Sequence, residues 1–287
     1  MKDRLSAAAV EQSLHTAFVM DIRALKPGNV HAYAAGHDMT AADFERSAEV
    51  SVPCLLRSDR SPGERLHDAV AATRAAVGCN TNLGMLLLAL PLVLAVQRPG
   101  QGSLQARVRD VLRSLDEFAD AGHFFAAIRL AAPGGLGETE QHDVNKAADV
   151  SVITAMCAAQ HRDRVARQYA SDYADIFAEP LNVLRDCKER WHSVEWSLVA
   201  CYLSFLTQFS DSHITRKYGE SVARDVRQQG DKILTSFLSY RNPEEAASEL
   251  LEFDAQLKAE AINPGTSADL SVTCLLVSEL EERLTEQ

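Results

Sequence analysis

The segment LGMLLLALPLVLAV, from Leu83 to Val96, constrains the fold more than any other part of the chain. It carries no charged residue, and an apolar run of this kind either crosses a membrane or lies inside a protein core. It is shorter than the roughly 20 residues that a membrane-spanning helix needs, and it contains Pro91. Proline removes a backbone hydrogen bond inside a helix and bends it. We therefore predict a buried helix that is kinked at Pro91.

The remainder of the chain shows helical periodicity in its apolar residues. Alanine and leucine are abundant and aromatic residues make up only 6 % of the chain, a balance that favours helices over sheets. No stretch alternates valine, isoleucine and threonine for long enough to predict a strand. We predict an all-α fold, a single compact domain over residues 1–287, with loops between its helices. The predicted helices cover residues 5–22, 40–57, 62–78, 82–97, 103–115, 116–131, 143–159, 161–179, 194–210, 219–239, 243–261 and 266–285.

Charge and cysteine content restrict the partners of the chain. The formal net charge of −11 argues against a general binder of nucleic acid or of membrane surfaces. It leaves room for an anionic small molecule, because a local group of cations and helix N-termini can bind phosphate. The six cysteines are scattered and form no CxxC pair, which favours reduced thiols and a cytoplasmic protein. The N-terminal segment does not resemble a signal peptide, and a homo-oligomer is compatible with the sequence.

The unusual polar residues gather where one predicted helix gives way to the next. Five such clusters are rich in glycine together with Asn, Asp, Thr or basic residues. Each alone is explained as a loop between helices, but five together resemble the rim of one pocket. They are LKPGNVH (Leu25 to His31), GCNTNLG (Gly78 to Gly84), APGGLGETEQHDVN (Ala132 to Asn145), SDSHITRKYGE (Ser210 to Glu220) and NPGTSADL (Asn263 to Leu270).

Two of these clusters have two interpretations each, as part of a nucleotide-binding site or as an ordinary structural element. Asn80, Thr81 and Asn82 cap the following helix, or contact a ribose or phosphate at its end. The glycines from Gly134 resemble a phosphate loop, but no strand precedes them and the Walker Lys-Ser/Thr pair is missing.

The two C-terminal clusters have similar alternatives. Asp211 beside Arg216 and Lys217 can bind Mg²⁺ and a triphosphate, or belong to a solvated charged face. Thr266 and Ser267 form a capping box, or offer hydroxyl and backbone N–H groups to an anion. The segment HRDRVARQYASDYADIF is mostly a solvated helix face, although Asp163 in it can turn inward.

Taken in order, these motifs resemble the triphosphoribosyl-dephospho-CoA synthase family, which includes the prosthetic-group enzymes of citrate lyase and malonate decarboxylase. The resemblance rests on KPGNVH, HDMTAADFERSA, NTNLG, GGLG with a following DV, DSHITRKYG and NPGTSADL, and it spans about residues 25–275. It implies an all-helical enzyme that breaks the N-glycosidic bond of ATP and releases adenine. The triphosphoribosyl group is joined to the ribose 2′-hydroxyl of 3′-dephospho-CoA.

The resemblance, combined with this chemistry, assigns candidate roles. Cations must neutralise the triphosphate, and a carboxylate near the acceptor could take its proton. Lys26, Arg216 and Lys217, with Mg²⁺, suit the triphosphate. Asp143, Asp211 and Asp269 suit catalysis, the first two also as metal ligands. The remaining candidates for binding ATP and the acceptor are Gly28, Asn29, His31, Asn80, Thr81, Asn82, Gly134, Gly135, Asn263, Gly265, Thr266 and Ser267.

Departures from the family pattern concern the acceptor. The citrate-lyase and malonate-decarboxylase branches read closer to KPGLVD, NTHKG and D(T/S)NLxxRGG, whereas this chain resembles the archaeal and methylotroph branch. A CoA-like acceptor and a tetrahydromethanopterin precursor are therefore both candidate acceptors. A nucleotide sensor without catalysis and a hydrolase that transfers the ribosyl group to water are further alternatives. For the loop cation Lys26, replacement by alanine is predicted to weaken ATP use far more than folding.

Overall fold

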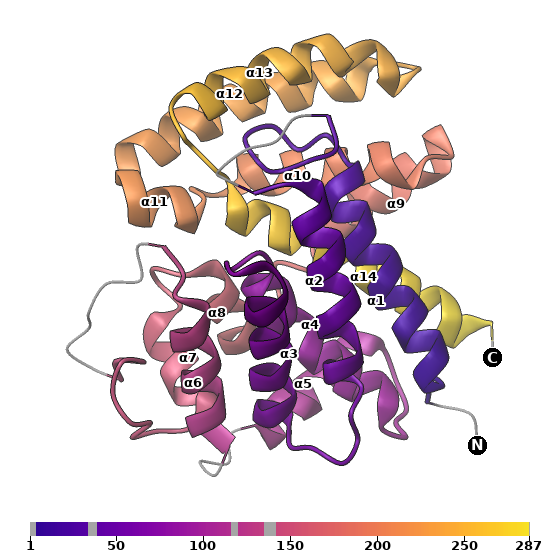
Figure 1. Ribbon diagram of the computed structural model, residues 1–287. Coiled ribbons are helices and arrows are strands. Elements are labelled where there is room, and N and C mark those ends of the chain that lie inside the picture. Colours follow the sequence, from indigo (N-terminus) through magenta and orange to yellow (C-terminus); the bar gives the residue numbers. More distant parts are fainter. Residues whose placement is uncertain (1–3, 34–38, 116–119, 135–141, 287) are drawn as a thin grey trace.

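The computed structural model describes residues 4–33, 39–115, 120–134 and 142–286. In this part of the chain the regular elements are helices, as the sequence predicted (Figure 1). The bounds are α1 Ala7–Arg23, α2 Ala41–Leu55, α3 Pro62–Val77, α4 Leu83–Gln97, α5 Leu104–Ser114, α6 Ala121–Ala131, α7 Val152–Ala159, α8 Arg164–Ala170, α9 Glu179–Trp191, α10 Val194–Gln208, α11 Ser212–Tyr218, α12 Glu220–Ser239, the 3₁₀ helix η2 Pro243–Ala246, α13 Ala247–Ala259 and α14 Gly265–Thr285.

Helix α4 lies at the centre of the core. Every residue from Met85 to Val96 is buried, which confirms the predicted burial of this segment. It packs against α1, α2, α3, α5, α8 and α14. No described helix combines the length and the apolar character needed to cross a bilayer.

Two tyrosines satisfy the carbonyl groups around Pro91 in α4. Because proline has no N–H, the carbonyl of Leu87, four residues earlier, loses its helical donor. The hydroxyl of Tyr169 donates to that oxygen at 2.6 Å, and the hydroxyl of Tyr173 donates to the carbonyl of Leu88 at 2.8 Å. Both rings are fully buried. The proline is therefore accommodated inside the core by hydroxyl groups from the segment that follows α7.

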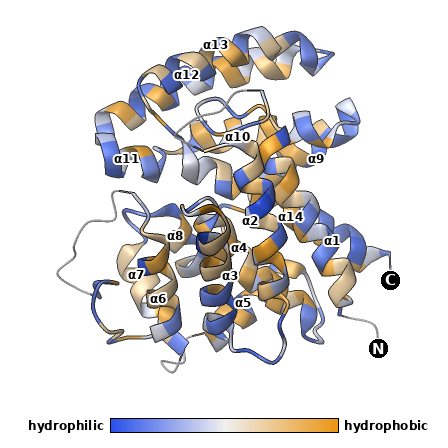
Figure 2. Cartoon of the chain, viewed as in Figure 1, coloured by the Kyte–Doolittle hydropathy of each residue, from blue (hydrophilic) through white to orange (hydrophobic). Residues whose placement is uncertain are grey.

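Helices α10 and α14 form the second part of the core. They pack against each other, and α10 also packs against α9 and α12. In Figure 1, α11, α12 and α13 lie on one side of α10, while α3 to α8 lie on the other side of the start of α14. The visible parts of α9 and α11 are mostly hydrophilic in Figure 2. The entry into α14 thus lies between the two groups of helices.

The structure differs from the predicted helices in two regions. Of the predicted helix 143–159 only α7 is helical, and α8 is followed by a turn in which Asp172 and Tyr173 have φ of 54° and 60°. Such left-handed conformations end a helix. Two helices, α9 and α11, were not predicted. In α11 the Asp211 carboxylate accepts hydrogen bonds from the first-turn N–H groups, and this cap separates it from α10.

Candidate active site

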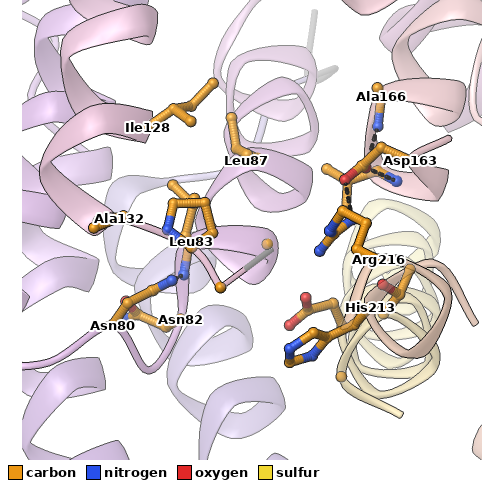
Figure 3. A pocket seen from close by; sticks show the side chains of 18 of the residues that line it. Asn80, Asn82, Leu83, Leu87, Ile128, Ala132, Asp163, Ala166, His213 and Arg216 are labelled. Atoms are coloured by element: carbon orange, nitrogen blue, oxygen red, sulfur yellow. Dashed lines mark hydrogen bonds and ion pairs between the residues drawn. The ribbon is translucent and has the colours of Figure 1, made fainter. Parts of the chain in front are cut away.

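A cavity of about 990 Å³ opens between the starts of α4 and α14, with α3, α6, α7, α8 and α11 around it. Residues from all five polar clusters line it, so the structure brings these separate parts of the sequence together. Figure 3 shows Asn80 and Asn82 on one side, with His213 and Arg216 facing them, and the apolar side chains of Leu87 and Ile128 at another end. The predicted site residues on its wall are Asn29, Asn80, Thr81, Asn82, Gly134, Arg216, Lys217, Asn263, Gly265, Thr266 and Asp269.

Two long helices direct their N-termini at the cavity. Leu83 and Gly84 of α4 and Gly265 and Thr266 of α14 all line the wall. The N–H groups of Gly84, Gly265 and Thr266 have no acceptor in the described chain. A helix N-terminus carries a partial positive charge from such N–H groups and attracts anions. The backbone therefore supplies an anion-binding wall, whatever the side chains add.

Four cationic side chains surround the same space. Arg216 forms an ion pair with Asp163, with Nη1 and Oδ2 2.6 Å apart (Figure 3). Within the described ranges, the side chains of Lys217, Arg162 and Arg74 make neither a hydrogen bond nor an ion pair, and all three are exposed. Arginine and lysine bind phosphate through charge-assisted hydrogen bonds. Three unpaired cations at a cavity mouth suit a polyanion.

Asp269 lies in the second turn of α14 against Gly84. A Cβ atom at position 84 would clash with Oδ2 of Asp269, so only glycine allows this approach. No residue that the structure describes donates a hydrogen bond to this carboxylate or forms an ion pair with it. Burial raises the pKa of Asp269 well above its usual value, and the nearby carboxylates of Asp21 and Asp211 raise it further. An unpaired carboxyl group with a raised pKa is suited to proton transfer near neutral pH.

The amide side chains have distinct local partners. Asn29 Nδ2 donates to Asn263 Oδ1 at 2.9 Å, and the buried Oδ1 of Asn29 has no partner in the described chain. Asn80 Oδ1 caps Leu83 N at 3.1 Å, while Asn82 Nδ2 donates to Ser51. The predicted capping role is thus present for Asn80, and Asn29 and Asn263 present polar groups to the cavity.

The KPGNVH loop is held against the protein interior, and only Asn29 of its predicted site residues lines the cavity. Lys26 is 0 % exposed and its Nζ lies 2.5 Å from Asp21 Oδ1, so the expectation of a loop cation free to bind phosphate was wrong. Gly28 has φ of 80° and donates to Asp254 Oδ1 at 2.8 Å. His31 Nε2 lies 3.1 Å from the same carboxylate oxygen. These three residues fix the loop that positions Asn29.

Asp211 is a structural cap and not a residue of the cavity wall. Its Oδ1 accepts from His213 N at 2.8 Å, and its Oδ2 accepts from Ser267 N at 2.7 Å and Ser267 Oγ at 2.8 Å. It therefore joins the starts of α11 and α14 and has its oxygen atoms occupied. The backbone N–H and the hydroxyl of Ser267 are both engaged in these hydrogen bonds, and the residue is 0 % exposed. The predicted catalytic and metal-binding roles of Asp211 do not fit this arrangement.

The other predicted metal ligand, Asp143, also lies off the cavity wall. Its Oδ1 accepts from Asn145 N at 2.9 Å. No group of three or more His, Cys, Asp or Glu side chains suited to a metal ion occurs among the described residues. The pairing of Asp143 with Asp211 as a resident metal site is therefore not supported. Gly135, the second glycine of the predicted phosphate loop, lies outside the described residues.

Three charged residues of the cavity wall were not predicted from the sequence. Asp21 lies on the buried face of α1, one turn after Ala17 and beside Ile22, and a carboxylate at a core-facing position is the signal that could have found it. Arg162 precedes the cap Asp163, which does turn inward, as the sequence allowed. Arg74 is an exposed residue in the last turn of α3, and nothing in its sequence pattern distinguishes it from a surface residue.

The described residues of this helical protein thus place unpaired cations, two helix N-termini and the unpaired Asp269 carboxyl group around one cavity, an arrangement suited to an enzyme that acts on a phosphorylated substrate. Residues 7–287 match the CitG family, described as ATP:dephospho-CoA triphosphoribosyl transferase, and the chain belongs to that family. Its fold is similar to the crystal structure of a protein from Archaeoglobus fulgidus proposed to be a triphosphoribosyl-dephospho-CoA synthase. That match has a TM-score of 0.60 and 24 % identity, and covers 81 % of this chain and 96 % of that chain. No curated protein matches the chain in sequence.

Proposed function

We propose that the cavity between α4 and α14 carries out the transfer of its family, moving the triphosphoribosyl group of ATP to the 2′-hydroxyl of 3′-dephospho-CoA. One observation carries the proposal. Unpaired cations, two helix N-termini and an unpaired carboxylate with a raised pKa meet at one cavity. These are the groups needed to hold a triphosphate and to accept the proton of an attacking hydroxyl.

The triphosphate is assigned to the cationic side of the cavity. Arg216 and Lys217 lie on α11, close to the N-terminus of α14, and Arg162 lies at the rim beside them. Mg²⁺ enters as part of the substrate, bound by the phosphate oxygens, because Mg²⁺ commonly binds through substrate phosphates. This placement needs no resident metal site in the protein.

Asp269 is assigned the role of general base. In the reaction, the bond between C1′ of the ATP ribose and the adenine nitrogen breaks, and adenine leaves with the electron pair and takes up a proton from solvent. A bond then joins C1′ to the 2′-oxygen of the acceptor, whose proton passes to the Asp269 carboxylate. The oxocarbenium-like centre at C1′ also benefits from a nearby negative charge. The amides of Asn29 and Asn263 are placed to hydrogen-bond a ribose or adenine.

The test is adenine release from ATP and Mg²⁺, followed by chromatography, with and without 3′-dephospho-CoA. The proposal expects release that depends on the acceptor and a product that contains both ribose units. Asp269→Asn should slow release by about 10²–10⁴-fold, whereas Asp225→Asn, a matched change on the exposed side of α12, should leave it unchanged. Release without an acceptor would indicate a hydrolase. Acceptor-dependent release at the wild-type rate in the Asp269→Asn variant would remove Asp269 from the mechanism.

A further inference from the structure

A second cavity adjoins the proposed active site. Its volume is about 410 Å³, and it shares Arg162 and Asp163 of its wall with the larger cavity. The C-terminal end of α10 and residues of α8, α11 and α12 complete it. The two spaces therefore adjoin each other at the segment that leads into α8.

The wall of this second cavity is strongly cationic although the protein is acidic. It contains two carboxylates, and both are already in use. Asp163 pairs with Arg216 and caps α8, and Glu220 accepts from Ser210 Oγ at 2.6 Å. Four guanidinium groups also face this space, from Arg162, Arg164, Arg167 and Arg227. Two of them are paired from outside the wall, because Asp175 Oδ2 lies 3.2 Å from Arg164 Nη1 and 3.3 Å from Arg167 Nε.

The arginines are held in ways that leave donors for a ligand. The Arg164 guanidinium lies 3.9 Å from the ring centroid of Phe209, which fixes its plane. Arg227 uses Nε to donate to Thr207 O at 2.9 Å, and its terminal nitrogens have no partner in the part of the chain described. Arg162 has no side-chain partner there at all. Planar guanidinium groups of this kind bind phosphate oxygens in pairs.

The chemistry of the acceptor explains why two adjoining anion sites would be needed. In 3′-dephospho-CoA the 2′-hydroxyl and the 5′-diphosphate belong to the same ribose. When that hydroxyl reaches Asp269 in the larger cavity, the diphosphate lies only a few bonds away. The larger cavity must at the same time hold the triphosphate of ATP. A separate cationic space beside it keeps the two sets of phosphates apart.

We infer that the cavity lined by Arg164, Arg167 and Arg227 binds the diphosphate of the acceptor, beside the site of the ATP triphosphate, with Arg162 on the wall that the two sites share. This inference rests on the proposed function for the identity of the acceptor. The binding of a diphosphate group by this cavity does not depend on turnover and can be tested separately.

The experiment compares Arg227→Gln and Arg167→Gln with Arg224→Gln, an exposed arginine of α12 that does not line the cavity. Calorimetry with inorganic pyrophosphate should show binding to the wild-type protein that weakens about tenfold in the first two variants and not in the third. In steady-state assays the same two variants should raise KM for 3′-dephospho-CoA about tenfold, while KM for ATP stays within about twofold. Thermal unfolding identifies any variant that fails to fold, and the other variant then carries the test.

The outcomes separate this inference from the proposed function. Pyrophosphate binding that is absent in the wild type, or unchanged in both variants, would overturn the inference. So would binding that is lost only in Arg216→Gln, because that result would place pyrophosphate in the larger cavity. Weakened pyrophosphate binding in Arg227→Gln without dephospho-CoA-dependent adenine release would support the diphosphate site and reject the proposed acceptor.

Discussion

Asp269 lies on the cavity wall, and its carboxylate lowers the stability of the folded protein. Its carboxylate has no hydrogen-bond donor in the described chain and faces the nearby carboxylates of Asp21 and Asp211. The folded-state pKa therefore lies above that of the unfolded chain. Ionised Asp269 lowers stability at neutral pH, and this cost disappears as the pH falls through the folded-state pKa towards the unfolded value. Such a cost is typical of a residue retained for its chemistry.

Replacing Asp269 by asparagine should therefore separate activity from stability. We expect kcat to fall by about 10²–10⁴-fold because the proton acceptor is lost. We expect Tm at pH 7 to rise by about 2 °C because a buried charge is removed. The gain should shrink as the pH is lowered to about 4, where wild-type Asp269 is itself protonated. Scanning calorimetry at several pH values measures this trend, and a variant less stable than the wild type at pH 7 would contradict it.

Lys26 contributes to the stability of the folded protein. Its ammonium group pairs with Asp21 in the interior, and removing one partner leaves a buried charge uncompensated. We expect Lys26→Met to lower the free energy of unfolding by about 3–5 kcal/mol, measured by urea denaturation. Adding Asp21→Asn to this variant should restore part of the loss. A single variant as stable as the wild type would show that the buried pair does not matter for folding.

At the scale of the element, the sequence predicted helices best where composition and caps agreed. Thr40 and Asp43 form a capping box at the start of α2, where the sequence predicted a helix from residue 40, and α4 is buried as its uniform apolarity required. The region between residues 143 and 194 was predicted poorly. There α7 and α8 are short, and residues of this region make contacts that are distant in sequence. The Tyr169 and Tyr173 hydroxyls that bond to α4 are one example, and no local pattern reveals such partners.

The dependence of α4 on Tyr169 can be tested with a double-mutant cycle. We expect Tyr169→Phe to cost about 1–3 kcal/mol because the Leu87 carbonyl is left buried without a donor. In a Pro91→Ala background the same change should cost less than half as much, since the new backbone N–H at position 91 can reach that carbonyl.

Tyr202→Phe is the matched control for this cycle. The hydroxyl of Tyr202 donates to Pro27 O at 2.5 Å, a bond that does not involve α4. Its cost, measured by urea denaturation, should be the same in both backgrounds. Equal costs for Tyr169→Phe in the two backgrounds would show that Tyr169 does not compensate for the proline.

At the scale of the whole molecule, the charge at the cavity is opposite in sign to the net charge of the chain. A chain of net charge −11 concentrates exposed, unpaired cations at one cavity. Composition alone allowed such a local group but could not place it. The five polar clusters correctly pointed to one pocket, because the α1–α2, α3–α4, α6–α7, α10–α11 and α13–α14 junctions meet at one cavity. The sequence could not show which of their carboxylates line the cavity and which are structural, since a buried cap such as Asp211 and a carboxylate of the cavity wall are the same residue type.

This arrangement predicts a strong effect of salt on substrate binding. Raising the ionic strength from about 0.05 to 0.5 M should raise KM for ATP by about tenfold with little change in kcat, because exposed charges are screened. Lys217→Gln should make this dependence weaker. Lys232→Gln, an exposed lysine on α12, should leave it unchanged. Equal salt dependence in the wild type and in Lys217→Gln would exclude Lys217 from the ATP site.

The N-termini of α4 and α14 at this cavity affect how the site can change during evolution. Peptide groups present the same dipole whatever side chains they carry, and they do not titrate. Attraction for phosphate that resides in the backbone therefore survives substitutions that would remove it from an arginine or a lysine. The surrounding side chains are left free to vary, while the two helix N-termini at the cavity are retained with the fold itself.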